Sequence, residues 1–247
     1  MGERSITELA QKIREHAPVS EIRKIRKIAY VADHSGEIYS PSGKVLQLPS
    51  HQACRKSKRT FSEHFRIIEE HANVYEPPVL AEPLDHPDGP TVVVNPPFPP
   101  MTASQLDAVY DLPFSYQAHP RYKGKKIPAL EMIRFSVCLH RGCFGGCSFC
   151  TIAAHQGKEV SSRSRESVLK EISRLSSLRE FRGYLTDLGG PTANMYRMRG
   201  KNPEVCSACR RTSCLFPSVC RNLDTSHKPL LDLYEAVLQP KYLAEAV

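Results

Sequence analysis

The sequence lacks the long hydrophobic segments of membrane and secreted proteins. No run approaches the roughly 18 consecutive apolar residues that a membrane-spanning helix needs. The first residues, Met1–Ile6, are too polar for a secretory signal peptide. N-terminal myristoylation is excluded as well, because its motif requires Ser or Thr where Ile6 stands. We therefore expect a soluble, cytoplasmic protein without a membrane partner.

The composition also lacks the bias of a disordered chain. The 247 residues are 40% hydrophobic and 24% charged, which allows one large core or two smaller ones. The net charge of +8 comes from 34 Lys and Arg against 26 Asp and Glu, and it is spread over short clusters rather than gathered in a tail. Such a charge fits a solvated surface or a nucleic-acid partner.

Short segments of regular structure are predicted before residue 77. The capping-box pattern Ser5–Glu8 predicts an amphipathic helix, and a second one, Thr60–Glu63, predicts a helix that ends near Asn73. Between them, residues 22–31 and 43–48 are typical of short strands or extended arms. These pieces do not make an obvious self-contained domain.

Proline dominates the next stretch, between Pro77 and Pro113. Each proline fixes a backbone angle and removes an N–H donor. Only the apolar run Thr91–Val94 is typical of a strand. We therefore expect residues 77–130 to form a stiff, extended connector.

A strand, a loop, a helix and a second strand are predicted from residue 131 onward. The first strand covers Met132–Val137. Ser164 is the expected N-cap of a helix whose apolar residues share one face: Val168, Leu169, Ile172 and Leu175. The second strand covers Gly183–Thr186 and ends before Gly189–Pro191. This order is typical of parallel sheets and barrels. A further apolar helix is expected at about 230–238.

Cysteine usage points to metal chemistry. Of nine cysteines, eight lie between Cys138 and Cys220. An odd number of cysteines without a secretory signal argues against a disulfide framework and favours metal or cluster ligation.

The strongest motif is the loop that carries Cys143, Cys147 and Cys150. Three thiolates on one short loop can each bind a different iron of a cubane cluster, because Gly145 and Gly146 let the backbone curl. The fourth iron then stays open to an external chelator with an amine and a carboxylate. A structural zinc site would normally require four protein ligands.

This loop resembles the signature of radical S-adenosylmethionine enzymes, including an aromatic residue, Phe149, directly before the last cysteine. Further stretches resemble the YgiQ-type branch of that superfamily: Asn95–Pro97, Tyr110–Pro113, His119–Pro120, Ile127–Ser136, Arg141–Cys150, Arg163–Ser164 and Asp187–Tyr196. The resemblance is specific over most of residues 91–225 and diffuse before residue 91.

The resemblance implies that Cys143, Cys147 and Cys150 hold a 4Fe-4S cluster and that Phe149 packs against the adenine of S-adenosylmethionine. It implies an enzyme that receives an electron from a donor such as flavodoxin or ferredoxin and generates a 5'-deoxyadenosyl radical. Many members of the superfamily carry Gly-Gly-Glu after the second strand, where the backbone meets the cofactor. Gly189 and Gly190 match this pattern and Pro191 departs from it.

The resemblance also implies a fold class. We expect an α/β protein containing the N-terminal part of a partial (β/α)6 barrel. Residues 1–76 would be the tail of an upstream α/β domain, 77–130 the connector, and 131–247 the barrel portion with a cysteine-rich insertion at 206–220. Because the residues after Cys150 supply only part of six strand-helix units and the chain stops without a closing strand, we expect a fragment of a longer protein.

A second group of cysteines has the spacing of a metal site. Cys206, Cys209, Cys214 and Cys220 lie within fifteen residues and are predicted to bind a second metal or cluster, or else to be free thiols. An alternative function is a zinc-binding module that binds RNA through the basic clusters. It explains this second group and the charge, but it leaves the Cys143–Cys150 loop unexplained.

The remaining candidates are given structural roles. Cys138 is expected to be a small core residue and Cys54 an inert surface thiol. His140 and His155 flank the loop without an assigned catalytic role. Arg163 and Arg165 are expected to be ordinary surface arginines rather than ligands of a carboxylate. The substrate and the catalytic residues are not specified by any motif.

Overall fold

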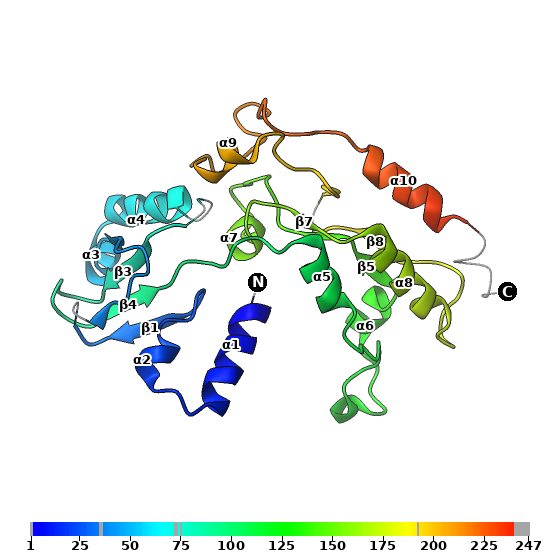
Figure 1. Cartoon of the computed structure of the whole chain (residues 1–247), viewed down its shortest axis with the longest axis horizontal. Helices are drawn as coiled ribbons and strands as arrows, with labels where there is room; N and C mark the ends of the chain where they lie inside the picture. The colour runs from blue at the N-terminus through cyan, green and yellow to red at the C-terminus, as the bar shows by residue number, and fades with distance from the viewer. Residues whose placement is uncertain (1, 35–36, 72–73, 75, 192, 240–247) are drawn as a thin grey trace. The chain divides into compact units, whose positions relative to one another are not determined.

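The computed structural model describes residues 2–34, 37–71, 74, 76–191 and 193–239. The chain divides into two compact units (Figure 1). We call Met1–Pro99 with Asn202–Thr212 the N-terminal unit, and Pro100–Lys201 with Ser213–Val247 the cysteine-loop unit. The chain end whose missing strand suggested a fragment, residues 240–247, lies outside the described residues.

The N-terminal unit is built on a four-stranded sheet with the order β1-β4-β3-β2. Its strands are β1 Ala29–Ala32, β2 Val45–Gln47, β3 Val79–Pro83 and β4 Thr91–Val94. Its helices are α1 Glu3–Arg14, α2 Val19–Ile22, α3 His51–Lys56, α4 Lys58–His71 and α9 Pro203–Ser207. β4 pairs antiparallel with β1 and β3, and β2 pairs parallel with β3.

Side-chain alternation explains which face of this sheet is buried. Residues of a strand point alternately to opposite faces, and in β3 Val79 and Ala81 are fully buried while their neighbours are partly exposed. Val79 packs with Val93 of β4 and Ala32 of β1 in one small core. The Asn95 amide then donates to the carbonyls of Arg23 and Ile25, at 2.7 and 2.6 Å, and ties the end of β4 to the chain before β1.

Regular structure fills much of the stretch for which the sequence predicted an extended connector. β3 and β4 lie within residues 77–130, and so does helix α5, Ala103–Tyr110. The helix begins with a capping box in which Thr102 and Gln105 satisfy each other's backbone N–H groups. This pattern is readable in the sequence and would have predicted α5. β4 is the run Thr91–Val94 for which the sequence predicted a strand, and this prediction is confirmed. β3 depends on pairing with β2 and β4, which a local pattern does not reveal.

Two other helices begin earlier than predicted. α1 starts at Glu3 without a side-chain cap, and Ser5 instead donates its hydroxyl to the carbonyl of Arg26 at 3.0 Å. α4 starts at Lys58, and the Ser57 hydroxyl accepts the N–H of Thr60 at 3.2 Å. Tertiary contact and an upstream serine therefore replace the two expected capping boxes.

The cysteine-loop unit contains the predicted strand-loop-helix-strand order. After α5 come a 3-10 turn at Pro120–Tyr122, α6 Pro128–Ile133, β5 Ser136–Cys138, β6 His140–Arg141, α7 Ile152–Gln156, β7 Ser161–Ser162, α8 Arg165–Ser176, β8 Asp187–Gly189 and α10 Lys228–Val237. β5 and β8 pair in parallel, with Cys138 opposite Gly189. β6 and β7 pair antiparallel. Figure 1 shows α8 beside β5 and β8.

The element boundaries differ from the predicted ones. α6 occupies Met132 and Ile133, which were expected to be strand, because Pro128 at the first helical turn favours a helix there. Both side chains are exposed, at 72% and 61%, so they do not form a buried strand. β8 begins at Asp187 rather than Gly183. The chain is therefore a mixed α/β protein, and the partial barrel stays a prediction.

The core of this unit lies between α8, β5 and α10. Val168, Ile172 and Leu175 of α8 are fully buried, as the predicted helix face requires, and Ser164 caps the helix by accepting the N–H of Ser167. They pack with Val137 of β5 and Leu233 of α10. Burial of each such side chain contributes about 1.5–3 kcal/mol. Within the described ranges, no helix is long and apolar enough to cross a bilayer.

Candidate metal centre

The loop with three cysteines is closed at its base by backbone contacts. It follows β6 and runs into α7, and the N–H of Cys143 donates to the carbonyl of Gly157 at 3.0 Å. Gly142 has a φ of +95°, and a Cβ on it would lie 2.1 Å from the carbonyl oxygen of Glu159. Only glycine fits this close approach. The backbone directly before Cys143 is thus held in one conformation.

Two of the three cysteine sulfurs meet at one glycine. A Cβ on Gly145 would lie 3.3 Å from the Sγ of Cys143 and 3.6 Å from the Sγ of Cys147. The Gly145 N–H also donates to the Cys143 Sγ at 3.4 Å. The missing side chain at Gly145 therefore leaves a cradle between two potential ligands.

The third cysteine is brought back by a turn. The N–H of Cys150 donates to the carbonyl of Cys147 at 3.0 Å. Cys143 is buried, Cys150 is half-buried and Cys147 is exposed. Among the residues that the structure describes, no three Cys, His, Asp or Glu side chains are already arranged to hold a metal ion. The donor set and the Gly145 cradle nevertheless fit an iron–sulfur cluster, which takes several thiolates from one short loop.

Phe149 lies at the exposed side of this loop. Its side chain is 89% exposed, so it has no part in the core. Large exposed aromatic side chains are available for stacking on a planar ligand. Its contact with an adenine stays a prediction.

Residues 213–214, far from the loop in the sequence, hydrogen-bond to its backbone. The Ser213 hydroxyl donates to the carbonyl of Gly145 at 2.6 Å, and the N–H of Cys214 donates to the carbonyl of Phe144 at 3.0 Å. An apolar cluster contains Cys143, Phe144, Met195, Met198 and Leu223, with Cys214 and Cys220 packed against it. Sequence reasoning missed this support, because no motif links the two segments.

The second cysteine group is divided between the two units. Cys206 and Cys209 belong to the N-terminal unit, where the N–H of Cys209 donates to the carbonyl of Cys206 at 3.1 Å. Cys214 and Cys220 belong to the cysteine-loop unit and are joined by a backbone hydrogen bond of 2.7 Å. The four-thiolate site stays a prediction.

Gly189 and Gly190 lie where β8 ends beside the start of the loop. The N–H of Leu139 donates to the carbonyl of Gly189 at 2.7 Å. Gly190 approaches a side chain of this protein: a Cβ on it would lie 1.9 Å from the Nε2 of His140. His140 is 1% exposed, and its burial lowers its pKa to about 4. Contact of the two glycines with a cofactor stays a prediction.

Arg163 is not the surface residue that the sequence suggested. It is 1% exposed and pairs with Glu171, which is also buried. The other carboxylate oxygen of Glu171 accepts the Tyr116 hydroxyl at 3.2 Å. Its guanidinium lies 4.1 Å from the ring centroid of Tyr110, and burial raises the pKa of Tyr110 to about 12. The expectation of a surface arginine was wrong, because a position directly before a helix N-cap does not indicate how deeply the side chain is buried. Arg165 is exposed, as expected.

Other candidates lie outside the loop. His155 is exposed on α7. Cys138 is only partly buried, and its thiol donates to the carbonyl of His140 at 3.2 Å. Burial raises the pKa of Cys54, which agrees with an inert thiol rather than an activated one.

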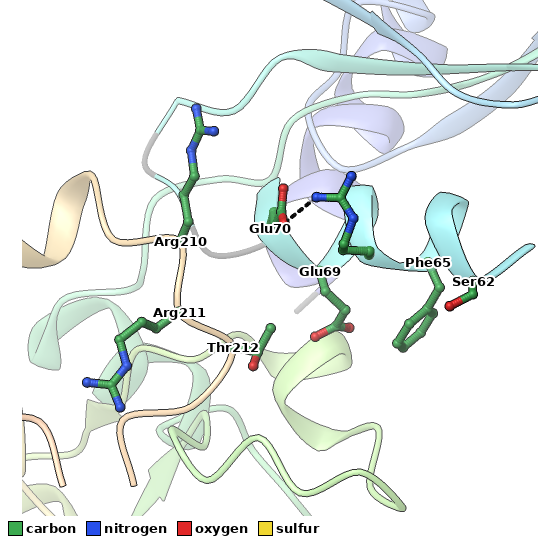
Figure 2. Close-up of a pocket in the computed structure, with 8 residues that line it drawn as sticks. Ser62, Phe65, Glu69, Glu70, Arg210, Arg211 and Thr212 are labelled. Atoms are coloured by element: carbon green, nitrogen blue, oxygen red, sulfur yellow. Dashed lines mark hydrogen bonds and ion pairs between the residues drawn. The ribbon is translucent and has the colours of Figure 1, made fainter. Parts of the chain in front are cut away.

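A cleft in the N-terminal unit is unrelated to these residues. It has a volume of about 550 Å³ and lies between α4 and residues 210–212. Its lining mixes opposite charges: Arg66 and Glu70 are ion-paired at 2.6 Å, and Figure 2 shows Arg210 and Arg211 directed away from Glu69. No predicted site residue lines it.

Known proteins share this sequence over most of its length. A family profile described as Radical SAM N-terminal matches residues 1–136, including the part where the motif resemblance was diffuse. A UPF0313 protein of Bacteroides thetaiotaomicron is 46% identical over 246 residues, which cover 96% of this chain and 39% of that protein.

Two further relatives carry the same description. The UPF0313 protein of Porphyromonas gingivalis is 46% identical over 237 residues, covering 96% of this chain and 37% of that protein. The one of Methanocella arvoryzae is 39% identical over 238 residues, covering 96% and 38%. The chain thus spans less than half the length of these relatives. No solved structure matches it.

Proposed function

The chain belongs to the YgiQ-type radical S-adenosylmethionine family, and from this premise we propose that it is an iron–sulfur enzyme whose Cys143, Cys147 and Cys150 hold a 4Fe-4S cluster. Such a cluster supplies the electron for reductive cleavage of S-adenosylmethionine to methionine and a hydrogen-abstracting 5'-deoxyadenosyl radical. The observation that carries the proposal is the convergence of the Cys143 and Cys147 sulfurs on Gly145.

The residues around the loop have distinct parts in this proposal. The Gly145 N–H donates to the Cys143 sulfur and helps to orient it. Phe144, Met195 and Met198 cover the buried side of Cys143 and keep water from it. Exposed Phe149 would stack on the adenine, and Gly189 and Gly190 would let the backbone approach the methionine part of the cofactor.

The partners follow from the same chemistry. The cluster requires a one-electron donor such as flavodoxin or ferredoxin, and its sensitivity to oxygen fits a cytoplasmic location. The relatives are much longer than this chain. We therefore propose the radical chemistry for the whole protein of which this sequence matches one part.

Metal and sulfide analysis after anaerobic reconstitution tests the cluster. We expect about four irons and four sulfides per chain, and an electron paramagnetic resonance spectrum that changes on addition of S-adenosylmethionine. Cys147→Ser should lose the cluster, whereas Cys54→Ser, a thiol of the other unit, should keep it. Zinc without iron in the wild-type protein refutes the enzyme and favours the zinc-binding, RNA-interacting alternative.

The same measurement tests the second cysteine group. We propose that Cys206, Cys209, Cys214 and Cys220 bind one further metal ion or cluster. Metal beyond the first cluster that is lost together in Cys209→Ser and Cys220→Ser supports this site. Identical metal content in wild type and both variants refutes it.

A further inference from the structure

The side chain of His140 joins the strand before the cysteine loop to the chain after β8. Its Nε2 lies 3.0 Å from the backbone nitrogen of Met195. A Cβ on Gly190 would lie 1.9 Å from this Nε2, so the imidazole occupies the space that a side chain at Gly190 would need. The ring is 1% exposed. One buried imidazole therefore contacts both Gly190 and Met195, which lie far from His140 in the sequence.

The chemistry of this contact requires an uncharged ring. A backbone N–H can only donate, so Nε2 accepts the hydrogen bond from Met195 and the ring proton resides on Nδ1. Burial lowers the pKa of His140 to about 4, against a smaller opposing effect of the Ala193 backbone. The imidazole thus stays a neutral acceptor at physiological pH.

The position of His140 in the chain links this contact to the cysteine loop. β6 carries His140 only three residues before Cys143, and β6 is held by pairing with β7. The N–H of Arg163 also donates to the carbonyl of Leu139 at 3.0 Å. A shift of the His140 ring would therefore change the placement of Gly190 relative to the base of the loop.

We propose that His140 is a positioning residue for S-adenosylmethionine: by accepting the Met195 N–H and packing against Gly190, it holds the glycine pair at the correct place beside the cysteine loop. This inference rests on the proposed function. It assigns to His140 an effect on cofactor affinity that is separate from cluster ligation.

Two amide variants test whether the acceptor at the position of Nε2 matters, because they imitate different ring nitrogens. Gln can place an acceptor oxygen near the position of Nε2, whereas Asn retains a polar group only near Nδ1. On the reconstituted protein, we expect His140→Asn to weaken S-adenosylmethionine binding at least tenfold in equilibrium dialysis, and His140→Gln to stay within about threefold of wild type. Iron and sulfide content should be equal in all three proteins. His155→Asn, an exposed histidine of the same unit, is the matched control and should bind like wild type.

Size complementarity gives a second, independent readout. Gly190→Ala places a methyl group against the ring and should weaken cofactor binding at least tenfold. Combining it with His140→Ala removes the ring and should restore part of the thermal unfolding midpoint lost in Gly190→Ala. Additive effects of the two substitutions on the midpoint refute the packing contact.

The outcomes distinguish this inference from the function on which it rests. A wild-type protein that binds no cluster or no S-adenosylmethionine refutes the proposed function and the inference with it. A wild type that binds both, with His140→Asn binding equally well, refutes the inference alone. Equal weakening in the Asn and Gln variants, or loss of iron in His140→Asn, also refutes it, because either shows a general structural effect.

Discussion

The cysteine loop and the buried polar residues of the same unit differ in how firmly the protein holds them. In the loop, Cys147 and Phe149 are exposed. By contrast, His140 and Arg163 are each 1% exposed and have specific polar partners. We call His140, Arg163 and Glu171 the buried polar group.

This difference separates the residues that would bind a ligand from those that stabilise the fold. Cys147 is exposed and can bind a ligand without disturbing the core. The buried polar group resists substitution, because interiors are close-packed and buried charges depend on their partners. We therefore expect substitutions in the buried polar group to reduce the stability of the fold, and substitutions at Cys147 and Phe149 to affect ligand binding alone.

The largest expected effect is at the buried ion pair. Glu171→Ala leaves the Arg163 guanidinium buried without its carboxylate and should lower the free energy of unfolding by about 3–5 kcal/mol. Urea unfolding followed by circular dichroism measures it. As a control, Lys228→Ala removes an exposed ion pair with Asp232, in which the two atoms lie 2.8 Å apart, and should leave the free energy of unfolding nearly unchanged. Equal losses of unfolding free energy in the two variants would contradict the distinction between the buried polar group and the exposed surface.

The second effect is a pH dependence from His140. Its pKa is about 4 in the folded protein and about 6.5 in an unfolded chain. As pH falls from 7 to 4, the unfolded state takes up the proton first, so the folded protein should lose about 3 kcal/mol of stability. Above pH 7 this contribution is fully present. Denaturation at several pH values should show this slope in wild type and not in His140→Gln, and parallel profiles would contradict it.

Two glycines with nearly the same φ sharpen the comparison further. Gly142 and Gly157 have φ values of +95° and +96°, but only Gly142 has an atom within 4 Å of its missing Cβ. Alanine at Gly157 should cost about 1–3 kcal/mol from backbone strain. Alanine at Gly142 should cost about 1–3 kcal/mol more, because the chain at Glu159 must move. Urea unfolding of both variants measures the difference, and equal values would show that the contact is easily relieved.

The smallest expected effect on stability is in the loop itself. In the metal-free protein, Cys147→Ser and Phe149→Ala should each change the free energy of unfolding by less than about 0.5 kcal/mol, because both side chains are exposed. Urea unfolding without metal measures this, and iron analysis of a separately reconstituted Cys147→Ser sample should show that the cluster is lost. A loss above about 1 kcal/mol would place the loop within the packed structure.

Several elements were readable from local pattern. The apolar spacing of Val168, Ile172 and Leu175 predicted the buried face of α8, and Ser164 predicted its start. The parallel pairing of β5 and β8 followed from the strand-loop-helix-strand order. These predictions hold because helix periodicity and capping are properties of neighbouring residues.

Other elements depended on distant partners. β3 is made of residues in a proline-rich stretch, yet it pairs with both β2 and β4. Backbone pairing across the sheet decides such a strand, and no window of adjacent residues contains that information. Met132 and Ile133 were also assigned to a strand and belong to α6, but there the missed signal was local, because Pro128 in the first helical turn favours a helix.

The sequence by itself determined the chemistry of the candidate site, because the spacing of Cys143, Cys147 and Cys150 and the glycines between them are local properties of one loop. Only the tertiary structure decided what holds that loop in place. His140 meets Met195, 55 residues away along the chain, and Arg163 is buried against Glu171. These contacts arise from burial and close packing, which no spacing along the chain expresses.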